Sequence, residues 1–157
     1  MKDEKLLQYC LDPDTANYGF NLLVRKYQEQ VYHHIRRILI DHDDTDDAVQ
    51  ETFVKVWINL KKFRSDSKLY TWIYRIATNE ALYILKKRKR KYFLPIVDYE
   101  EQLAQTLEQD EALSGDQIQL KLQKAILSLP EKQRLVFNLK YFKEMKYSDM
   151  SEVLGTS

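Results

Sequence analysis

The sequence predicts an all-α protein built from two small helical domains, with the second domain ending in a truncated helix-turn-helix. Glycine and proline number only three each in 157 residues, so few positions interrupt a helix. Apolar residues recur every three or four positions along most of the chain, which is the period of a helix with one buried face. An acidic stretch without such a period predicts a linker between the domains.

The charge pattern gives the domain boundaries. Residues 98–116 contain seven acids and no Lys or Arg, whereas residues 86–91 are six consecutive bases. We therefore expect a helical domain at residues 1–94, an acidic linker at 95–115 and a helix-turn-helix domain at 116–157. The net charge of +1 hides this segregation, which indicates more than one charged partner.

The first predicted helix covers residues 18–39 and follows a turn at Asp12–Asn17. Its apolar residues fall on one face and are Phe20, Leu23, Tyr27, Val31, Ile35 and Ile38. His33 and His34 are adjacent and therefore point about 100° apart, so they cannot bind one metal ion from a helix face.

The acidic residues 41–47 resemble a metal site only superficially. A calcium-binding EF-hand loop starting at Asp41 would need Gly at its sixth position and Glu at its twelfth, where this chain has Asp46 and Thr52. We expect no metal here, and instead a helix N-cap provided by Asp43, Asp44 or Thr45.

The helix predicted at residues 46–63 carries two stripes of side chains. The first steps by four and three residues and predicts the core face: Val49, Phe53, Val56, Leu60 and Phe63. Nearly opposite lie Asp47, Glu51, Val54 and Ile58, with Gln50 alongside. Apolar residues among acids, on a face turned away from the core, favour a protein-binding surface over scattered exposed side chains.

Residues 68–91 predict a long helix that ends in the basic block. One arc is apolar and consists of Leu69, Trp72, Ile73, Ile76, Ala77 and Ile84. Arg75, Thr78 and Asn79 lie beside or opposite that arc, where they can reach a partner. The pattern fits a nucleic-acid-binding helix, and equally a surface helix with a solvated basic end.

The last part of the chain predicts three short helices. Helical spacing resumes at residue 116 and ends at Leu129, and Pro130 can open the next helix, which runs from 131 to 141. A further helix over residues 147–154 ends at Gly155, in the manner of the first helix of a helix-turn-helix. The chain stops at Ser157, before the expected recognition helix.

The composition also limits the possible covalent links, metal sites and cellular location of the protein. Cys10 is the only cysteine, which excludes an intrachain disulfide and a cysteine-based zinc site. The first residues do not have the pattern of a secretory signal, and no apolar run is long enough for a membrane span. We expect a cytoplasmic protein.

Taken together, these features resemble the extracytoplasmic-function (ECF) group of bacterial RNA polymerase sigma factors. The resemblance rests on three motifs in the family's order, at residues 46–57, 63–90 and 129–157. It implies a non-enzymatic protein without cofactor or metal that binds core RNA polymerase and promoter DNA, and it allows for an anti-sigma factor as a partner. Two positions depart from the family's pattern: Lys146, where a small capping residue is common, and Ser151, where alanine is usual.

The resemblance also assigns residues to these partners. The polymerase-binding residues are the second stripe, Asp47, Gln50, Glu51, Val54 and Ile58. The residues that capture a melted promoter strand are Arg64, Ser65, Asp66, Ser67 and Lys68 in the loop, and Tyr70, Arg75 and Asn79 on the helix. The phosphate-binding residues are Lys86, Lys87, Arg88, Lys89, Arg90 and Lys91.

Two other functions fit the sequence less well. A stand-alone helix-turn-helix regulator explains neither the second stripe of the helix at 46–63 nor the aromatic residues of the second motif. A hydrolytic enzyme would need paired carboxylates, a nucleophile motif, a glycine-rich phosphate loop or a metal-ligand spacing, and the sequence offers none of these.

Overall fold

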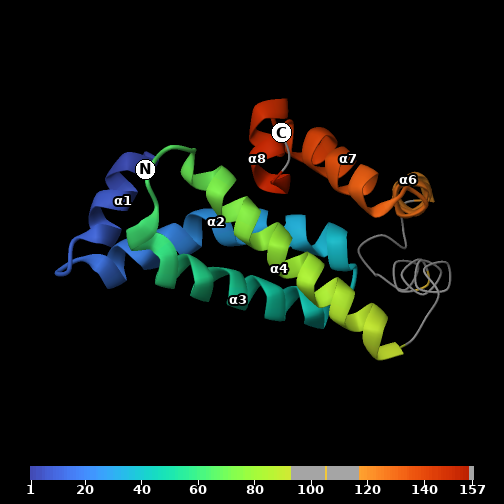
Figure 1. Cartoon of the computed structure of the whole chain (residues 1–157), viewed down its shortest axis with the longest axis horizontal. Helices are drawn as coiled ribbons and strands as arrows, with labels where there is room; N and C mark the ends of the chain where they lie inside the picture. The colour runs from blue at the N-terminus through green and yellow to red at the C-terminus, as the bar shows by residue number, and fades with distance from the viewer. Residues whose placement is uncertain (93–104, 106–116, 156–157) are drawn as a thin grey trace.

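The structure is a computed structural model, and it describes residues 1–92, 105 and 117–155 (Figure 1). The first part contains α1 (Asp3–Leu11), α2 (Ala16–Leu39), α3 (His42–Asn59) with a 3-10 turn at Leu60–Lys62, and α4 (Leu69–Tyr92). The second part contains α6 (Gln117–Leu127), α7 (Glu131–Lys143) and α8 (Tyr147–Leu154). The predicted all-α class is confirmed. The predicted linker, 95–115, lies outside the described residues apart from Gln105.

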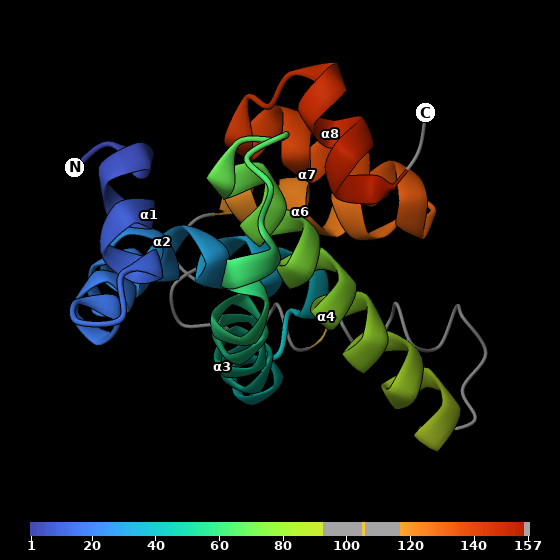
Figure 2. The ribbon, with the colours of Figure 1, turned by 60° about the vertical axis from the view of Figure 1, so that its left-hand side comes forward.

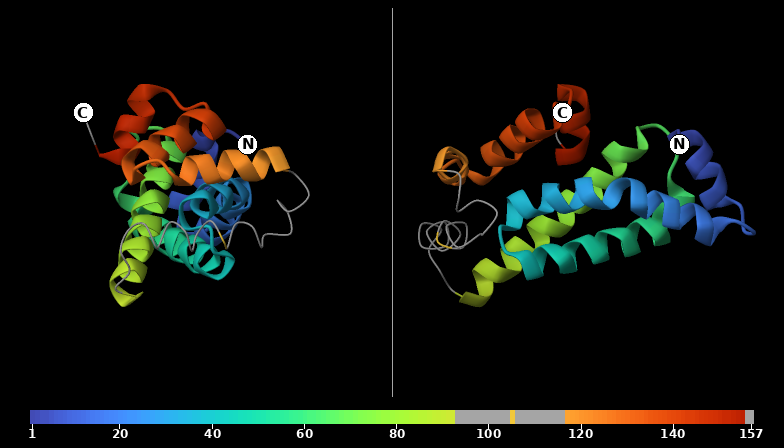
Figure 3. Two further views of the ribbon diagram at one scale, coloured as in Figure 1. Left: turned by 90° about the vertical axis from the view of Figure 1, so that its right-hand side faces the viewer. Right: turned by 180° about the vertical axis from the view of Figure 1, so that it is seen from behind.

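Helices α2, α3 and α4 pack side by side and enclose the main core (Figure 3). The predicted apolar face of α2 is confirmed, because Leu23, Val31 and Ile35 are completely buried in this core. Burying such a side chain contributes roughly 1.5–3 kcal/mol, so this face fixes how α2 sits. None of the described helices is both long enough and apolar enough to cross a membrane.

Helix α1 is an element that the apolar spacing did not predict. It has only two buried residues, Leu6 and Cys10, which is too few to produce a recognisable period. Gly19 allows its close approach to α2, since a Cβ there would lie 2.6 Å from the backbone nitrogen of Cys10. The hydroxyl of Tyr27 also donates a hydrogen bond to Asp3, at 2.8 Å. Helix α1 therefore covers one end of the bundle.

The corner between α2 and α3 differs from the prediction. The N-cap of α3 is Asp41, whose side chain accepts a hydrogen bond of 2.9 Å from the backbone nitrogen of Asp44, so the predicted caps were wrong. The preceding residue, Ile40, has a φ of 64° and a ψ of −43°, and the Asp41 nitrogen donates to the Leu39 carbonyl at 2.7 Å. This is a strained γ-turn, which costs about 1–3 kcal/mol. Burial of the Ile40 side chain offsets that cost.

The core face of α3 includes small polar residues that the apolar pattern passed over. Phe53 is buried as predicted, whereas Val49 is only partly buried and Thr52 is completely buried. The Thr52 hydroxyl donates to the carbonyl of Ala48 at 2.6 Å, and Ala48 is itself buried. A threonine whose hydroxyl is satisfied within its own helix can occupy a core position. The core face is therefore rotated toward Ala48 and Thr52.

Helix α4 is buried on two sides. Ile73 and Ala77 pack into the main core with α2 and α3. Tyr74 is equally buried, but against residues of α7, the following turn and α8. Figure 2 shows α8 lying against α4, and α7 contacts α2. A single apolar stripe could not reveal this second contact, because it depends on how the two parts meet.

His34 gives the fold a measurable pH dependence. Burial, together with the nearby charges of Lys143 and Arg37, lowers the pKa of His34 to about 3, and its Nε2 lies 2.7 Å from the hydroxyl of Thr78. The folded protein therefore keeps this ring neutral, whereas the unfolded chain takes up a proton below pH ~6.5. Its contribution is complete above that pH, and the free energy of unfolding then falls by ~1.4 kcal/mol for each pH unit below it.

Substitution of His34→Gln, which keeps a polar side chain beside Thr78, should remove this part of the pH dependence. Urea unfolding of both proteins across the range from pH ~4 to ~7 measures it, and the wild type should show the steeper loss of stability toward acid. Parallel curves for the two proteins would mean that His34 is not held neutral.

Candidate polymerase and nucleic-acid interfaces

The five residues predicted to bind polymerase all lie on the outward face of α3. Asp47, Gln50 and Glu51 are exposed, and Val54 and Ile58 are exposed to 49% and 63%. The structure therefore brings these residues together on one accessible surface. Its composition is acidic toward the start of the helix and apolar toward its end.

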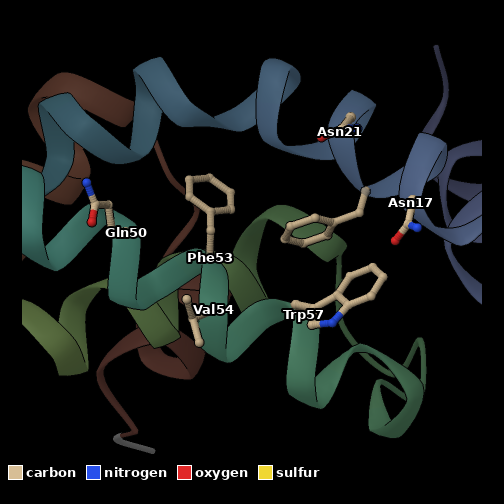
Figure 4. A pocket seen from close by; sticks show the side chains of 7 residues that line it. Asn17, Asn21, Gln50, Phe53, Val54 and Trp57 are labelled. Atoms are coloured by element: carbon tan, nitrogen blue, oxygen red, sulfur yellow. The ribbon is translucent and has the colours of Figure 1, made fainter.

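A groove of about 560 Å³ runs beside this surface, between α2 and α3 (Figure 4). It is lined by Asn17, Phe20, Asn21, Gln50, Phe53, Val54 and Trp57. The rings of Phe20 and Trp57 meet edge to face, with centroids 4.8 Å apart. A second cavity of about 500 Å³ shares Asn17 and Trp57 with the first and extends past Ile58 toward Pro13. Two of the predicted residues, Gln50 and Val54, thus form one wall of an apolar groove.

The sequence did not single out the aromatic residues of this groove. Phe20 belongs to the predicted core face of α2, and Trp57 lies within the first motif without a role of its own. In the structure Trp57 is 41% exposed. A large aromatic residue three positions after Val54 falls on the same side of a helix, so the spacing of the second stripe contained this signal.

Two of the α4 residues predicted to bind nucleic acid lie on a second surface. Arg75 and Asn79 are exposed, and Tyr83 continues the same row one turn further along and is 61% exposed. Positions four residues apart are neighbours on a helix, so the three side chains make a continuous polar and aromatic strip. Tyr83 is a candidate residue that the sequence prediction missed, although the spacing of four residues was visible.

The structure separates Tyr70 from this strip. Tyr70 and Asn79 are nine positions apart, which places them about 180° apart around the helix. Tyr70 faces the C-terminal helices, and its hydroxyl donates to Asp149 Oδ2 at 2.7 Å. Lys68 donates to the same oxygen at 3.0 Å. The predicted strand-binding residues therefore fall into two groups on opposite sides of α4.

The rest of the loop before α4 is accessible. Arg64, Ser65 and Asp66 are exposed, and Ser67 is partly buried. Ser65 has a left-handed backbone with a φ of 57°, which a non-glycine residue seldom adopts. Such a conformation persists only where the surrounding structure holds it, so the loop has a defined shape.

The residues of the basic block, 86–91, do not share one environment. Lys86 and Lys87 are exposed at the end of α4. The guanidinium of Arg88 is instead ion-paired with the acidic start of α3, with Asp44 and, at 3.5 Å, with Asp41. The side chains of Lys89, Arg90 and Lys91 lie outside the described part of the chain. Within the described part, no cluster of three or more His, Cys, Asp and Glu residues is placed to hold a metal ion.

A buried acid on α4, Glu80, helps to set the orientation of the α3 surface relative to the α4 surface. Glu80 is almost completely buried and is ion-paired with Lys55 of α3. The hydrogen bond with Glu80 raises the pKa of Lys55, so the lysine stays charged. Because a buried carboxylate needs its partner, this pair constrains the rotation of α4 against α3.

Comparison with known protein families supports the interpretation of both parts. The family model of Sigma-70 region 2 matches residues 23–91, which cover most of α2, the whole of α3 and all of α4 except its last residue. The family model of Sigma-70 region 4 matches residues 119–157. The two matches correspond to the two helical parts of the structure, and they leave the acidic segment between them.

The chain is also similar to individual sigma factors. It is 35% identical to RNA polymerase sigma-H factor of Pseudomonas aeruginosa, over 98% of this chain and 82% of that protein. It is 29% identical to the ECF RNA polymerase sigma factor SigW of Bacillus subtilis, over 87% of this chain and 78% of that protein.

A solved structure shares the fold. It is the sigma factor RpoE in complex with the anti-sigma factor NepR from Bartonella quintana, with a TM-score of 0.67, 21% identity and coverage of 88% of this chain and 84% of that one. The family matches, the extent of the similarity to sigma-H factor and the shared fold agree, and the chain belongs to the ECF group of RNA polymerase sigma factors.

Proposed function

We propose that this protein is a non-enzymatic specificity subunit of RNA polymerase, acting in the cytoplasm, which binds core polymerase and then recognises and opens promoter DNA. The observation that carries the proposal is the outward face of α3. It presents Asp47, Glu51 and Val54 beside an apolar groove, and a protein that only bound DNA would have no use for such a face.

The chemistry of this face suits a helical partner with both basic and apolar side chains. Trp57 and Phe20 can contact apolar side chains of a partner in the groove. Aromatic residues that become buried on binding often dominate the energy of a protein interface. Asp47 and Glu51 lie beside it and can pair with cations of the partner. The family resemblance implies a coiled coil on the clamp of the largest catalytic subunit. We also propose that an anti-sigma factor can bind this chain.

The α4 strip suits a strand whose bases have left the duplex. An extruded base needs a stacking surface and polar groups for its hydrogen-bonding edge. Tyr83 supplies a ring, and Asn79 and Arg75 supply amide and guanidinium groups on the same side. Lys86 and Lys87 follow at the end of the helix and can bind phosphates without regard to sequence.

The polymerase-binding role can be tested by reversing charge on α3. The double substitution Asp47→Lys and Glu51→Lys should abolish co-purification with core polymerase, since both side chains are exposed and the change should leave the helical circular-dichroism signal intact. A matched control is the double substitution Glu4→Lys and Glu29→Lys, which makes the same change of charge at exposed positions on α1 and α2. If the α3 variant still co-purified as well as this control, the proposed interface would be wrong. Binding by neither the control nor the wild type would favour a stand-alone regulator.

The phosphate-binding role predicts a change in salt dependence. Replacing Lys86 and Lys87 by Gln should weaken DNA binding by the complex with polymerase and reduce the slope of log K against log salt by up to ~2, at ~0.9 for each lost contact. The corresponding control changes Lys2 and Lys5 to Gln, which are exposed on the opposite end of the bundle. An unchanged slope in the Lys86 and Lys87 variant would contradict the proposal.

A further inference from the structure

We propose that the junction of α2, α4 and α7 contains a binding site for a phosphate group, made by Arg37, Lys143 and the hydroxyl of Tyr74. The inference goes beyond the proposed function, since none of these residues belongs to the surfaces assigned to polymerase or to the promoter strand, and it is tested without polymerase. Two sources would supply such a group: the backbone of DNA and a small phosphate compound.

Three helices bring these residues together. The Arg37 guanidinium of α2 lies over the ring of Phe142 in α7, 4.0 Å from its centroid. Lys143, the next residue of α7, has its Nζ 5.4 Å from the centroid of the Tyr74 ring in α4. Residues of α6 and α7 also join the main core, so α7 is held beside α2. Arg37 and Lys143 are both only partly buried, so an ion can reach them from solvent.

The two cations share this place without a carboxylate. Within the described part of the chain, neither is ion-paired, and Arg37 donates only to the carbonyl oxygen of His33, at 3.2 Å. Burial lowers the pKa of both cations, and for Lys143 the charge of Arg37 lowers it further. A bound anion would remove this repulsion. Other described cations that join two elements do meet a carboxylate: Lys26 with Asp3, Lys55 with Glu80, Lys68 with Asp149 and Arg88 with Asp44.

Tyr74 adds a hydrogen-bond donor that has no acceptor. Its side chain is 1% exposed, and its hydroxyl has no hydrogen-bond partner among the described residues. Burial raises the pKa of this hydroxyl, so it stays protonated, and the charge of Arg37 is near enough to act in the opposite direction. A buried donor without an acceptor costs free energy. An anion held by Arg37 would supply the missing acceptor.

A phosphate group fits these donors better than a carboxylate does. At neutral pH it carries nearly two negative charges, which match the two cations, and its oxygens point in different directions. The guanidinium, the ammonium and the hydroxyl come from three different helices, so each can donate to a different oxygen. Hydrogen bonds between charged groups are roughly twice as strong as neutral ones. A carboxylate offers one charge and two oxygens in a single plane.

NMR of the isotope-labelled full chain tests the site, by titration with inorganic phosphate at an ionic strength kept constant with chloride. In the wild type, the amide signals around Arg37 and Phe142 should shift and reach saturation. Lys143→Met keeps the stem of the side chain beside Tyr74 and removes its charge, so it should weaken phosphate binding about tenfold. Lys140→Met makes the same change at an exposed position of the same helix and should bind phosphate as the wild type does.

Tyr74→Phe provides a second variant that keeps the ring packing, because the hydroxyl that it removes has no partner among the described residues. It should also bind phosphate more weakly. Both variants remove an unfavourable group from the free protein, so in chloride neither should unfold at a lower temperature than the wild type. Phosphate should raise the unfolding temperature of the wild type and of Lys140→Met, and raise it less in Lys143→Met and Tyr74→Phe.

A second titration, with a short DNA duplex of mixed sequence, distinguishes the two sources. If the duplex shifts the same signals, and Lys143→Met reduces the slope of log K against log salt by ~0.9, the group is a DNA phosphate. If inorganic phosphate saturates the site and the duplex leaves these signals unchanged, the ligand is a small phosphate compound. The site would be overturned by the absence of shifts around Arg37 with either probe, or by equal phosphate affinity in the wild type, Lys143→Met and Tyr74→Phe.

Discussion

The burial of α4 on two sides determines which surfaces of this protein remain free. Ile73 and Ala77 face the core formed with α2 and α3, and Tyr74 faces the C-terminal helices. Only one long side of the helix is left for solvent, and it carries Arg75, Asn79 and Tyr83. The strip proposed to bind nucleic acid is therefore the part of α4 that stays exposed once both packing contacts are made, and a change in either contact would alter it.

The surfaces proposed to bind polymerase and nucleic acid are connected through the interior. The groove beside α3 and the strip on α4 belong to adjacent helices, and the Lys55–Glu80 ion pair sets the angle of one helix about the other. Such a pair contributes little net stability, but its loss would leave a buried carboxylate without a partner. Under the proposed function, a rigid connection of this kind would let polymerase binding on one face fix the position of the strip on the other.

The sequence predicted the helices well, because the period of three to four residues survives in α2, α3, α4 and α7. It did not predict α1, which has only two buried residues, or the burial of Thr52, whose polarity disguised a core position. The stripe predicted to bind polymerase could be recognised in the sequence because its five residues share one helix face. The spacing of Tyr70 and Asn79 also implied that they lie on opposite sides of the helix. The contact between Tyr70 and Asp149, in contrast, joins residues 79 positions apart in the chain and depends on tertiary structure alone.

We propose that the exposed strip of α4 captures a promoter strand after α3 has bound polymerase. Fluorescence of 2-aminopurine, placed in the non-template strand of the minus-ten element, measures strand separation directly, because the base brightens when it leaves the stack. Complexes with core polymerase should show this increase for the wild type and lose it for the double variant Arg75→Ala and Asn79→Ala, with polymerase binding unchanged. A full increase in the double variant would mean that Arg75 and Asn79 do not capture the strand.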